Sequence, residues 1–211
     1  NTQYVAHALK NDLNKIDWCA ALLDERLPEN RELQIIRGSV DHLRALLQRT
    51  RMHTGRVVLN PGDCDVRALF EQIIRETPHT DALRIEIDRC DDAPLYCDPS
   101  HVREALTNLV GNAVEAMRGS GRITLSYVRT AHKASVSVCD DGPGMTPAAQ
   151  KRIFEPYYTT KTSGENFGLG LYYCQNVMNV HEGSIRVSSA PGKGCTFTLI
   201  FPLAAQGRRK P

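Results

Sequence analysis

The spacing of apolar residues changes once along this chain, and the change divides the chain into two regions that must fold differently. Up to about residue 50, apolar residues recur at steps of three and four, which is the spacing of one face of an α-helix. The turn-like segment Leu27-Pro28-Glu29-Asn30 interrupts this pattern. The stripe before the turn contains Val5, Leu9, Leu13, Ile16, Ala20, Leu23 and Leu27, and the stripe after it contains Leu33, Ile36, Val40, Leu43 and Leu47. The sequence therefore predicts two amphipathic helices joined as a hairpin.

A hairpin of two helices cannot enclose a hydrophobic core by itself. We therefore expect the two apolar stripes to meet a second copy of the chain in a dimeric four-helix bundle. This prediction makes residues 1–55 a dimerisation region and the protein a homodimer.

From residue 56 onward, alternating strand patterns and helical patterns follow one another. Strands are predicted at residues 57–59, 83–87, 122–127, 136–139, 185–188 and 196–201, and helices at 65–76, 100–117 and 169–180. This order predicts an α/β sandwich with helices on one face of a mixed sheet. The chain as a whole is then an α+β protein, with its second domain at residues 56–204 and a flexible tail at residues 205–211.

Composition excludes several classes of protein. A net charge of +2 at pH 7 over 211 residues does not favour a nucleic-acid or membrane-surface partner. No apolar run approaches the roughly 20 residues that span a bilayer, so we expect a cytoplasmic location and no membrane contact by this stretch. The first residue is not methionine, and we expect a piece of a longer protein. The seven cysteines show no metal-ligand spacing and are predicted to be reduced thiols.

Three polar or glycine-rich motifs lie in the second region. Asp140-Asp141-Gly142-Pro143-Gly144-Met145 directly follows a predicted strand, and such a cluster can also be an ordinary turn. Asn108 and Asn112 lie four apart, hence on one face of a largely apolar helix. Phe167-Gly168-Leu169-Gly170-Leu171 precedes the last helix, where glycines let backbone N–H groups approach a phosphate. The intervening residues 146–166 have the composition of a mobile lid.

These motifs, in this order, resemble those of the catalytic core of bacterial sensor histidine kinases, within the GHKL or Bergerat type of ATP-binding domain shared with gyrase and MutL. The resemblance covers nearly the whole chain. The residues that carry it are His7 to Leu13, Glu104 to Ala113, Asp140 to Gly144, Ile153 to Lys161, Gly168 to Leu171, His181 to Ile185 and Gly192 to Pro202.

The resemblance implies that the second domain binds ATP and Mg²⁺. Asp140 would accept a hydrogen bond from the adenine amino group, and Asn112 would bind the metal ion through its side-chain oxygen. The other residues implied to contact the nucleotide are Asn108, Gly142, Gly144, Lys161, Gly168, Leu169, Gly170 and Thr196.

The resemblance also assigns roles in the first region. His7 would attack the γ-phosphoryl group of ATP and then pass it to an aspartate on the receiver domain of a response regulator. Asn11, one turn later, would support a phosphatase activity on that regulator, and Asp12 is a candidate base. The signal would come from a sensor domain upstream of this chain, and the full-length protein could be attached to a membrane.

Some residues depart from the family pattern and leave alternatives open. Ala8 replaces the acidic residue that usually follows the histidine, and Asn166 and Glu182 replace usual glycines. One alternative is an ATPase switch like gyrase or MutL, but Asn108 stands where those proteins carry the glutamate that activates water; Glu104 lies one turn further back. The other alternative is a phosphotransfer scaffold without kinase activity.

Overall fold

The computed structural model describes residues 59–78, 82–159 and 168–203, together with scattered positions between 15 and 40. Contacts divide the chain into two units, one containing Asn1–Val58 and Thr159–Phe167 and the other Leu59–Tyr158 and Gly168–Pro211. Each unit is considered by itself. His7, Asn11, Asp12 and Lys161 lie outside the described residues.

The described positions between 15 and 40 are helical on both sides of the predicted turn. Asn30 lies in the turn, and its side-chain oxygen accepts a hydrogen bond from the Leu33 backbone N–H at 3.0 Å, as a helix N-cap does. The apolar stripe positions in this region differ in exposure: Ala20, Leu33 and Val40 are buried, whereas Ile16, Leu23 and Ile36 are 42–44% exposed. The predicted helices are therefore confirmed at these positions. The bundle of two copies stays a prediction.

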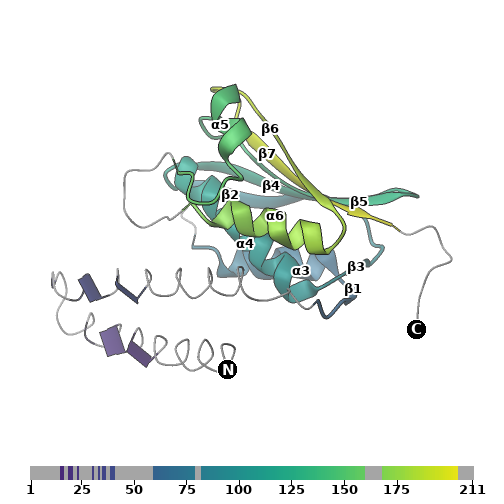
Figure 1. Ribbon diagram of the computed structural model, residues 1–211, viewed down its shortest axis with the longest axis horizontal. Coiled ribbons are helices and arrows are strands. Elements are labelled where there is room, and N and C mark those ends of the chain that lie inside the picture. The colour runs from purple at the N-terminus through teal and green to yellow at the C-terminus, as the bar shows by residue number, and fades with distance from the viewer. Residues whose placement is uncertain are drawn as a thin grey trace. The chain divides into compact units, whose positions relative to one another are not determined.

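The second unit is built on a five-stranded sheet with the order β2-β4-β5-β7-β6 (Figure 1). The strands are β2 (Leu83–Cys90), β4 (Gly121–Arg129), β5 (Lys133–Asp140), β6 (Ser184–Ser189) and β7 (Cys195–Pro202). The pair β2 and β4 is parallel, and the other neighbours are antiparallel. A separate two-stranded sheet pairs β1 (Gly62–Cys64) with β3 (Leu95–Cys97).

Three helices, α3 (Val66–Glu76), α4 (Pro99–Ala116) and α6 (Gly170–Val180), cover one face of the five-stranded sheet (Figure 1). The core lies between them, because alternate side chains of β4, β5 and β7 are buried on the helix side. Its largest members are Tyr127, Phe70, Ile73, Leu95, Leu106, Leu109, Ile123, Leu125, Met178 and Leu199. The predicted α/β sandwich with a mixed sheet is confirmed.

Helices α4 and α6 run antiparallel, and contacts along their length fix which turns meet. At one end, Asn108 lies beside Gly170, and in the middle the Cys174 thiol donates to the Ala105 carbonyl at 3.4 Å. At the other end, the Asp98 backbone N–H donates to His181 Nε2 at 3.0 Å, while His181 Nδ1 lies 2.7 Å from the Val177 carbonyl oxygen. The start of α6 is therefore held against the middle of α4.

Short elements account for most differences from the prediction. The strands β1 and β3 have three residues each, and α5 (Pro147–Arg152) occupies the start of the segment predicted as a lid. The predicted strand at residues 57–59 reaches the described residues only at Leu59, which is not in a strand. Among the helices of the described ranges, none is long and apolar enough to cross a membrane.

Candidate functional site

Asp140 is a buried acid at the end of β5. Its side chain is 7% exposed, and Oδ1 accepts a hydrogen bond from the Gly142 backbone N–H at 2.9 Å. Burial raises the pKa of the Asp140 carboxyl, and hydrogen bonds from the backbones of Gly142 and Cys195 act in the opposite direction. No Lys, Arg or His of the described residues forms an ion pair with Asp140. A buried carboxylate held by backbone donors alone is suited to accept a further hydrogen bond from a ligand.

Asp141, the second acid of the motif, has a structural role. Its Oδ1 accepts a hydrogen bond from the Arg122 backbone N–H at 2.9 Å, and its own N–H donates to the Arg122 carbonyl at 3.3 Å. Asp141 thus extends the pairing of β5 with β4, and its side chain is exposed.

The glycines that follow are required by close contacts. A Cβ on Gly142 would lie 2.8 Å from Asp140 Oδ1. Gly144 has a φ of +67°, and a Cβ there would lie 2.0 Å from the Ala190 carbonyl oxygen. The Gly192 backbone N–H also donates to the Pro143 carbonyl at 2.7 Å. These contacts pack the loop after β5 against the turn between β6 and β7.

The two asparagines of α4 are half-buried on one face of the helix, as predicted, with buried Leu106, Leu109 and Ala113 around them. Asn108 Nδ2 donates to the Glu104 carbonyl at 3.0 Å, and its Oδ1 faces Gly170. Within the described part of the chain, the Asn112 amide makes no hydrogen bond. Its oxygen is therefore available to a ligand or a cation.

The N-terminus of α6 also lacks a side-chain partner. No described side chain caps it, because Leu169 occupies the N-cap position and the first turn contains no acid. Gly168 has a φ of +65° and accepts a hydrogen bond from the Tyr157 N–H at 3.1 Å. A Cβ on Gly170 would lie 3.2 Å from Asn108 Oδ1. Uncapped N–H groups at a helix start form an anion site, and glycine lets the anion come close.

Thr196 lies on the opposite face of the sheet from Asp140. In the register of β5 with β7, Asp140 pairs with Cys195, and Thr196 is the next residue along the strand. Successive side chains of a strand point to opposite faces, so buried Cys195 shares the helix face with Asp140. Thr196 instead lines a shallow groove on the open face of the sheet, with Lys133 and Arg186. The Thr196 side chain therefore does not share the helix face with Asp140, and its contact with the nucleotide stays a prediction.

Two residues near Asp140 were missed by sequence reasoning. Buried Met117, at the C-terminal end of α4, lies 3.1 Å from the position of a Cβ on Gly142, and Cys195 is the strand partner of Asp140. Side chains on the same face of a strand are two residues apart, so counting back from buried Phe197 could have identified Cys195. Met117 carries no signal of its own, because apolar residues at helix ends are common.

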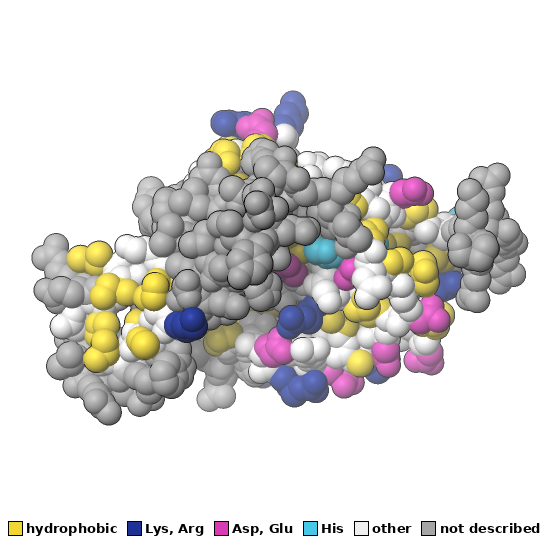
Figure 2. Space-filling view, turned by 60° about the horizontal axis from the view of Figure 1, so that its bottom comes forward, with side chains coloured by type: hydrophobic (Ala, Val, Ile, Leu, Met, Phe, Trp, Pro, Cys, Tyr) yellow, Lys and Arg dark blue, Asp and Glu magenta, His cyan; other side chains and the backbone are white. Residues whose placement is uncertain are grey.

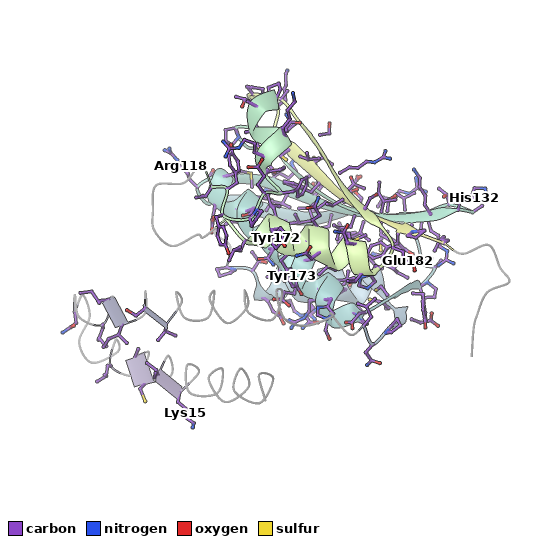
Figure 3. The ribbon with its side chains drawn as sticks, in the orientation of Figure 1. Lys15, Arg118, His132, Tyr172, Tyr173 and Glu182 are labelled. Atoms are coloured by element: carbon purple, nitrogen blue, oxygen red, sulfur yellow. The ribbon has the colours of Figure 1, made fainter. Side chains whose placement is uncertain are left out.

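Taken together, these residues extend along α4 from an apolar end to a polar end. Met117 and Asp140 could hold a flat aromatic base, with the carboxylate as a hydrogen-bond acceptor. Asn112, Asn108 and the start of α6 could hold an anionic tail. Figure 3 shows Tyr172 and Tyr173 on α6 and Arg118 just beyond the end of α4.

The site also fits a Mg²⁺ ion bound together with phosphates. No group of three or more His, Cys, Asp or Glu side chains in the described ranges could hold a metal ion alone. The unpartnered amide oxygen of Asn112 is the kind of single protein ligand that Mg²⁺ uses when phosphate oxygens and water complete its shell.

Surface charge does not suggest a polyanionic partner. On the face drawn in Figure 2, acidic and basic side chains of the described residues are interspersed, and no broad basic field gathers among them. This agrees with the net charge of +2.

Comparison with known proteins identifies the family. The family model described as histidine kinase-, DNA gyrase B- and HSP90-like ATPase matches residues 97–205. The signal transduction histidine-protein kinase AtoS of Escherichia coli strain K12 is 31% identical over 97% of this chain and 35% of AtoS. The sensor histidine kinase ZraS of the same strain is 30% identical over 94% of this chain and 44% of ZraS.

Solved structures of histidine kinases share the fold. Full-length ShkA in complex with AMPPNP aligns with 99% of this chain and 47% of ShkA, with a TM-score of 0.75 and 26% identity. Histidine kinase ThkA in complex with the response regulator protein TrrA aligns with 98% of this chain and 62% of ThkA, with a TM-score of 0.64 and 24% identity. This chain spans about a third to under half of the length of AtoS and ZraS. The chain belongs to the histidine kinase-, DNA gyrase B- and HSP90-like ATPase family and contains the ATP-binding catalytic domain of a two-component sensor histidine kinase.

Proposed function

We propose that this chain phosphorylates itself on His7 with ATP and then transfers the phosphoryl group to an aspartate of a response regulator. The observation that carries the proposal is the order of the site residues: a buried carboxylate with no ion-pair partner among the described residues, two half-buried asparagines and a helix start that no described side chain caps follow one another along α4. The carboxylate would contact the base of a nucleotide, the asparagines its metal-bound phosphates, and the helix start its phosphate tail.

At the base end, Asp140 would accept a hydrogen bond from the exocyclic amino group of adenine. Its Oδ1 already accepts the Gly142 N–H, and because a carboxylate oxygen can accept more than one hydrogen bond, Oδ2 would accept the bond from the base. Guanine carries a carbonyl oxygen at the corresponding position and would place two acceptors face to face. Asp140 therefore favours adenine over guanine.

At the phosphate end, the backbone N–H groups of Gly168 to Gly170 would receive phosphate oxygens, and Lys161 is proposed to reach the same group. Asn112 would ligate Mg²⁺, with Asn108 beside it. The ion supplies charge neutralisation of the triphosphate when it is bound.

The proposed reaction joins the two regions of the chain. An imidazole nitrogen of His7 attacks the γ-phosphorus, the new N–P bond forms, and the bond to the β,γ-bridging oxygen breaks, so ADP leaves with that electron pair. The ring proton passes to a base. Asp12 is our candidate for this base because Ala8 cannot accept a proton.

The oligomeric state and domain assignment are part of the proposal. Residues 1–55 would form the dimerisation and phosphoacceptor hairpin, residues 56–204 the ATP-binding domain and residues 205–211 a flexible tail. The exposure of Ile16 and Leu23 in the first helical stripe, and of Ile36 in the second, supports a homodimer, because a second copy would cover them. Asn11 is proposed to assist dephosphorylation of the regulator.

The remaining partners and the location are inferred from the relatives. ThkA, whose fold this chain shares, has been solved in complex with a response regulator, which supports the proposed receiver-domain partner. A sensor domain upstream and a cytoplasmic catalytic region are proposed from the names of the relatives.

An ATPase switch is the second candidate function, and one contact disfavours it. Asn108 cannot remove a proton from water. Glu104 could, but its Oε2 accepts a hydrogen bond from the Tyr173 hydroxyl at 2.5 Å. The Glu104 carboxylate is therefore already engaged by Tyr173.

The test is incubation with γ-labelled ATP and Mg²⁺, followed by acid and alkali treatment of the protein. We expect protein-bound label that is lost in acid and kept in alkali, as phosphohistidine is, and no bound label in His7→Gln. Release of free phosphate without bound label would support the ATPase switch, and nucleotide binding without consumption would support the scaffold.

A further inference from the structure

A chain of three polar side chains joins α4 to α6 next to the proposed phosphate end. The Tyr173 hydroxyl, from α6, donates to Glu104 Oε2 at 2.5 Å, and His101 Nδ1 lies 3.0 Å from the same hydroxyl oxygen. His101 and Glu104 both come from α4. Figure 3 labels Tyr173 and its neighbour Tyr172.

The direction of these hydrogen bonds follows from the carboxylate. An ionised carboxylate only accepts, so the Tyr173 hydroxyl must donate to Glu104 and must accept from His101. His101 therefore carries a hydrogen on Nδ1. Burial and then the bond to Glu104 raise the pKa of Tyr173 far above its usual range, so its hydroxyl stays protonated and remains a donor.

The hydrogen bond from Tyr173 restrains Glu104, and this restraint matters because of where Glu104 lies. Glu104 is one helical turn before Asn108, and Asn108 faces Gly170, the first residue of α6. No described side chain caps that helix start. An acid near an uncapped helix N-terminus is attracted to it by the helix dipole and by its free N–H groups. Without a restraint, Glu104 would be the chain's own competitor for the anion site.

We propose that Tyr173, oriented by His101, is a positioning residue that holds the Glu104 carboxylate away from the start of α6 and keeps that start available to the polyphosphate of a nucleotide. The proposal rests on the nucleotide site of the proposed function, but not on transfer to His7. Loss of the hydroxyl would release a negative charge next to the phosphates, whereas the adenosine part of the ligand would be unaffected.

The test compares ADP and adenosine by calorimetry without a divalent cation, in the parent chain, Tyr173→Phe, Glu104→Gln and the double variant. We expect Tyr173→Phe to weaken ADP binding by about fivefold to thirtyfold, as for a charge at a helix terminus, and to leave adenosine binding unchanged. In the double variant, ADP affinity should return to the parent value, because the neutral amide no longer competes. Tyr172→Phe is the matched control and should bind both ligands as the parent does.

Two results would overturn the proposal. The first is an ADP affinity unchanged in Tyr173→Phe. The second is a double variant as weak as Tyr173→Phe, which would mean that Tyr173 only joins the two helices. Melting temperatures of all variants separate a folding defect from a binding effect. A parent chain that binds ADP without forming phosphohistidine would refute the kinase proposal and leave this inference intact.

Discussion

Replacing Asp140 with asparagine should weaken ATP binding without weakening the fold. The carboxylate has two acceptor oxygens, of which Oδ1 is used by the Gly142 N–H at 2.9 Å. An asparagine has one oxygen and one NH₂ group. Whichever way the amide turns, either Gly142 or the adenine amino group then faces a donor instead of an acceptor.

The expected loss is that of one charge-assisted hydrogen bond. Such a bond contributes about 1.5 to 3 kcal/mol, which corresponds to about tenfold to a hundredfold in affinity. GTP should lose much less than ATP, because the new NH₂ group can donate to the guanine carbonyl. The preference for ATP over GTP should therefore shrink in Asp140→Asn.

Stability should move in the opposite direction, and this separates a binding residue from a structural one. Burial raises the folded-state pKa of Asp140 above its value in the unfolded chain, so the ionised form is disfavoured by folding at pH values above that pKa. A neutral amide removes this penalty. We expect an unchanged or higher melting temperature at pH 7.

Calorimetric titration with ATP and GTP, together with thermal unfolding, checks both expectations. An Asp140→Asn variant with the parent's affinity for ATP would remove Asp140 from the site. A variant that loses binding only because its melting temperature collapses would make Asp140 a structural residue.

The remaining predictions concern pH dependence, two glycines, Asp98 and the oligomeric state. Nucleotide affinity in the parent should fall as the pH is lowered, because Asp140 becomes protonated, and its raised pKa places the midpoint above that of an ordinary aspartate. Binding titrations across pH check this, and the pH dependence should vanish in Asp140→Asn. Gly144→Ala should lower the free energy of unfolding by more than about 1 kcal/mol, because φ is positive and Ala190 blocks the Cβ. Gly111→Ala, which meets open space in α4, should lose nothing in the same denaturant titration. Asp98→Ala should lower the unfolding free energy by about 2 kcal/mol in a urea titration at neutral pH, because a buried carboxylate that accepts three backbone N–H groups is lost. An unfolding free energy equal to that of the parent at neutral pH would contradict this. By light scattering, the full chain should be a dimer and the ATP-binding domain alone a monomer; a monomeric full chain at micromolar concentration would refute the four-helix bundle.

Much of the second domain's fold could be predicted from the sequence, because apolar and polar residues alternate regularly along its long strands. The strands β2, β4, β5, β6 and β7 each contain the predicted residues. The three-residue strands β1 and β3 are too short to show a period, and they are stabilised by pairing with each other across more than 30 residues. Such long-range pairing has no local signal.

The sequence predicted the positions of some residues of the candidate site better than those of others. Asn108 and Asn112 follow from helical spacing, and their half-buried positions on α4 agree with the prediction. Whether Thr196 or Cys195 shares a face with Asp140 depends on the register of β7 against β5, where a shift of one residue reverses the face, and that register has no local signal in the sequence.

The Tyr173 contact lay beyond sequence reasoning for a similar reason. Tyr173 and Glu104 are 69 residues apart, and only the antiparallel packing of α4 on α6 brings them together. A tyrosine four residues into an amphipathic helix otherwise looks like a core residue.

The most direct test of the central claim is to locate the phosphoryl group on the chain. After incubation with ATP and Mg²⁺, digestion with trypsin at neutral or alkaline pH should release residues 1–10, whose only histidine is His7. We predict that mass spectrometry finds one phosphoryl group on this peptide in the parent chain, and none in Asn112→Ala or in His7→Gln. A phosphoryl group on another peptide, or an unmodified peptide 1–10 while ATP is consumed, would contradict the account.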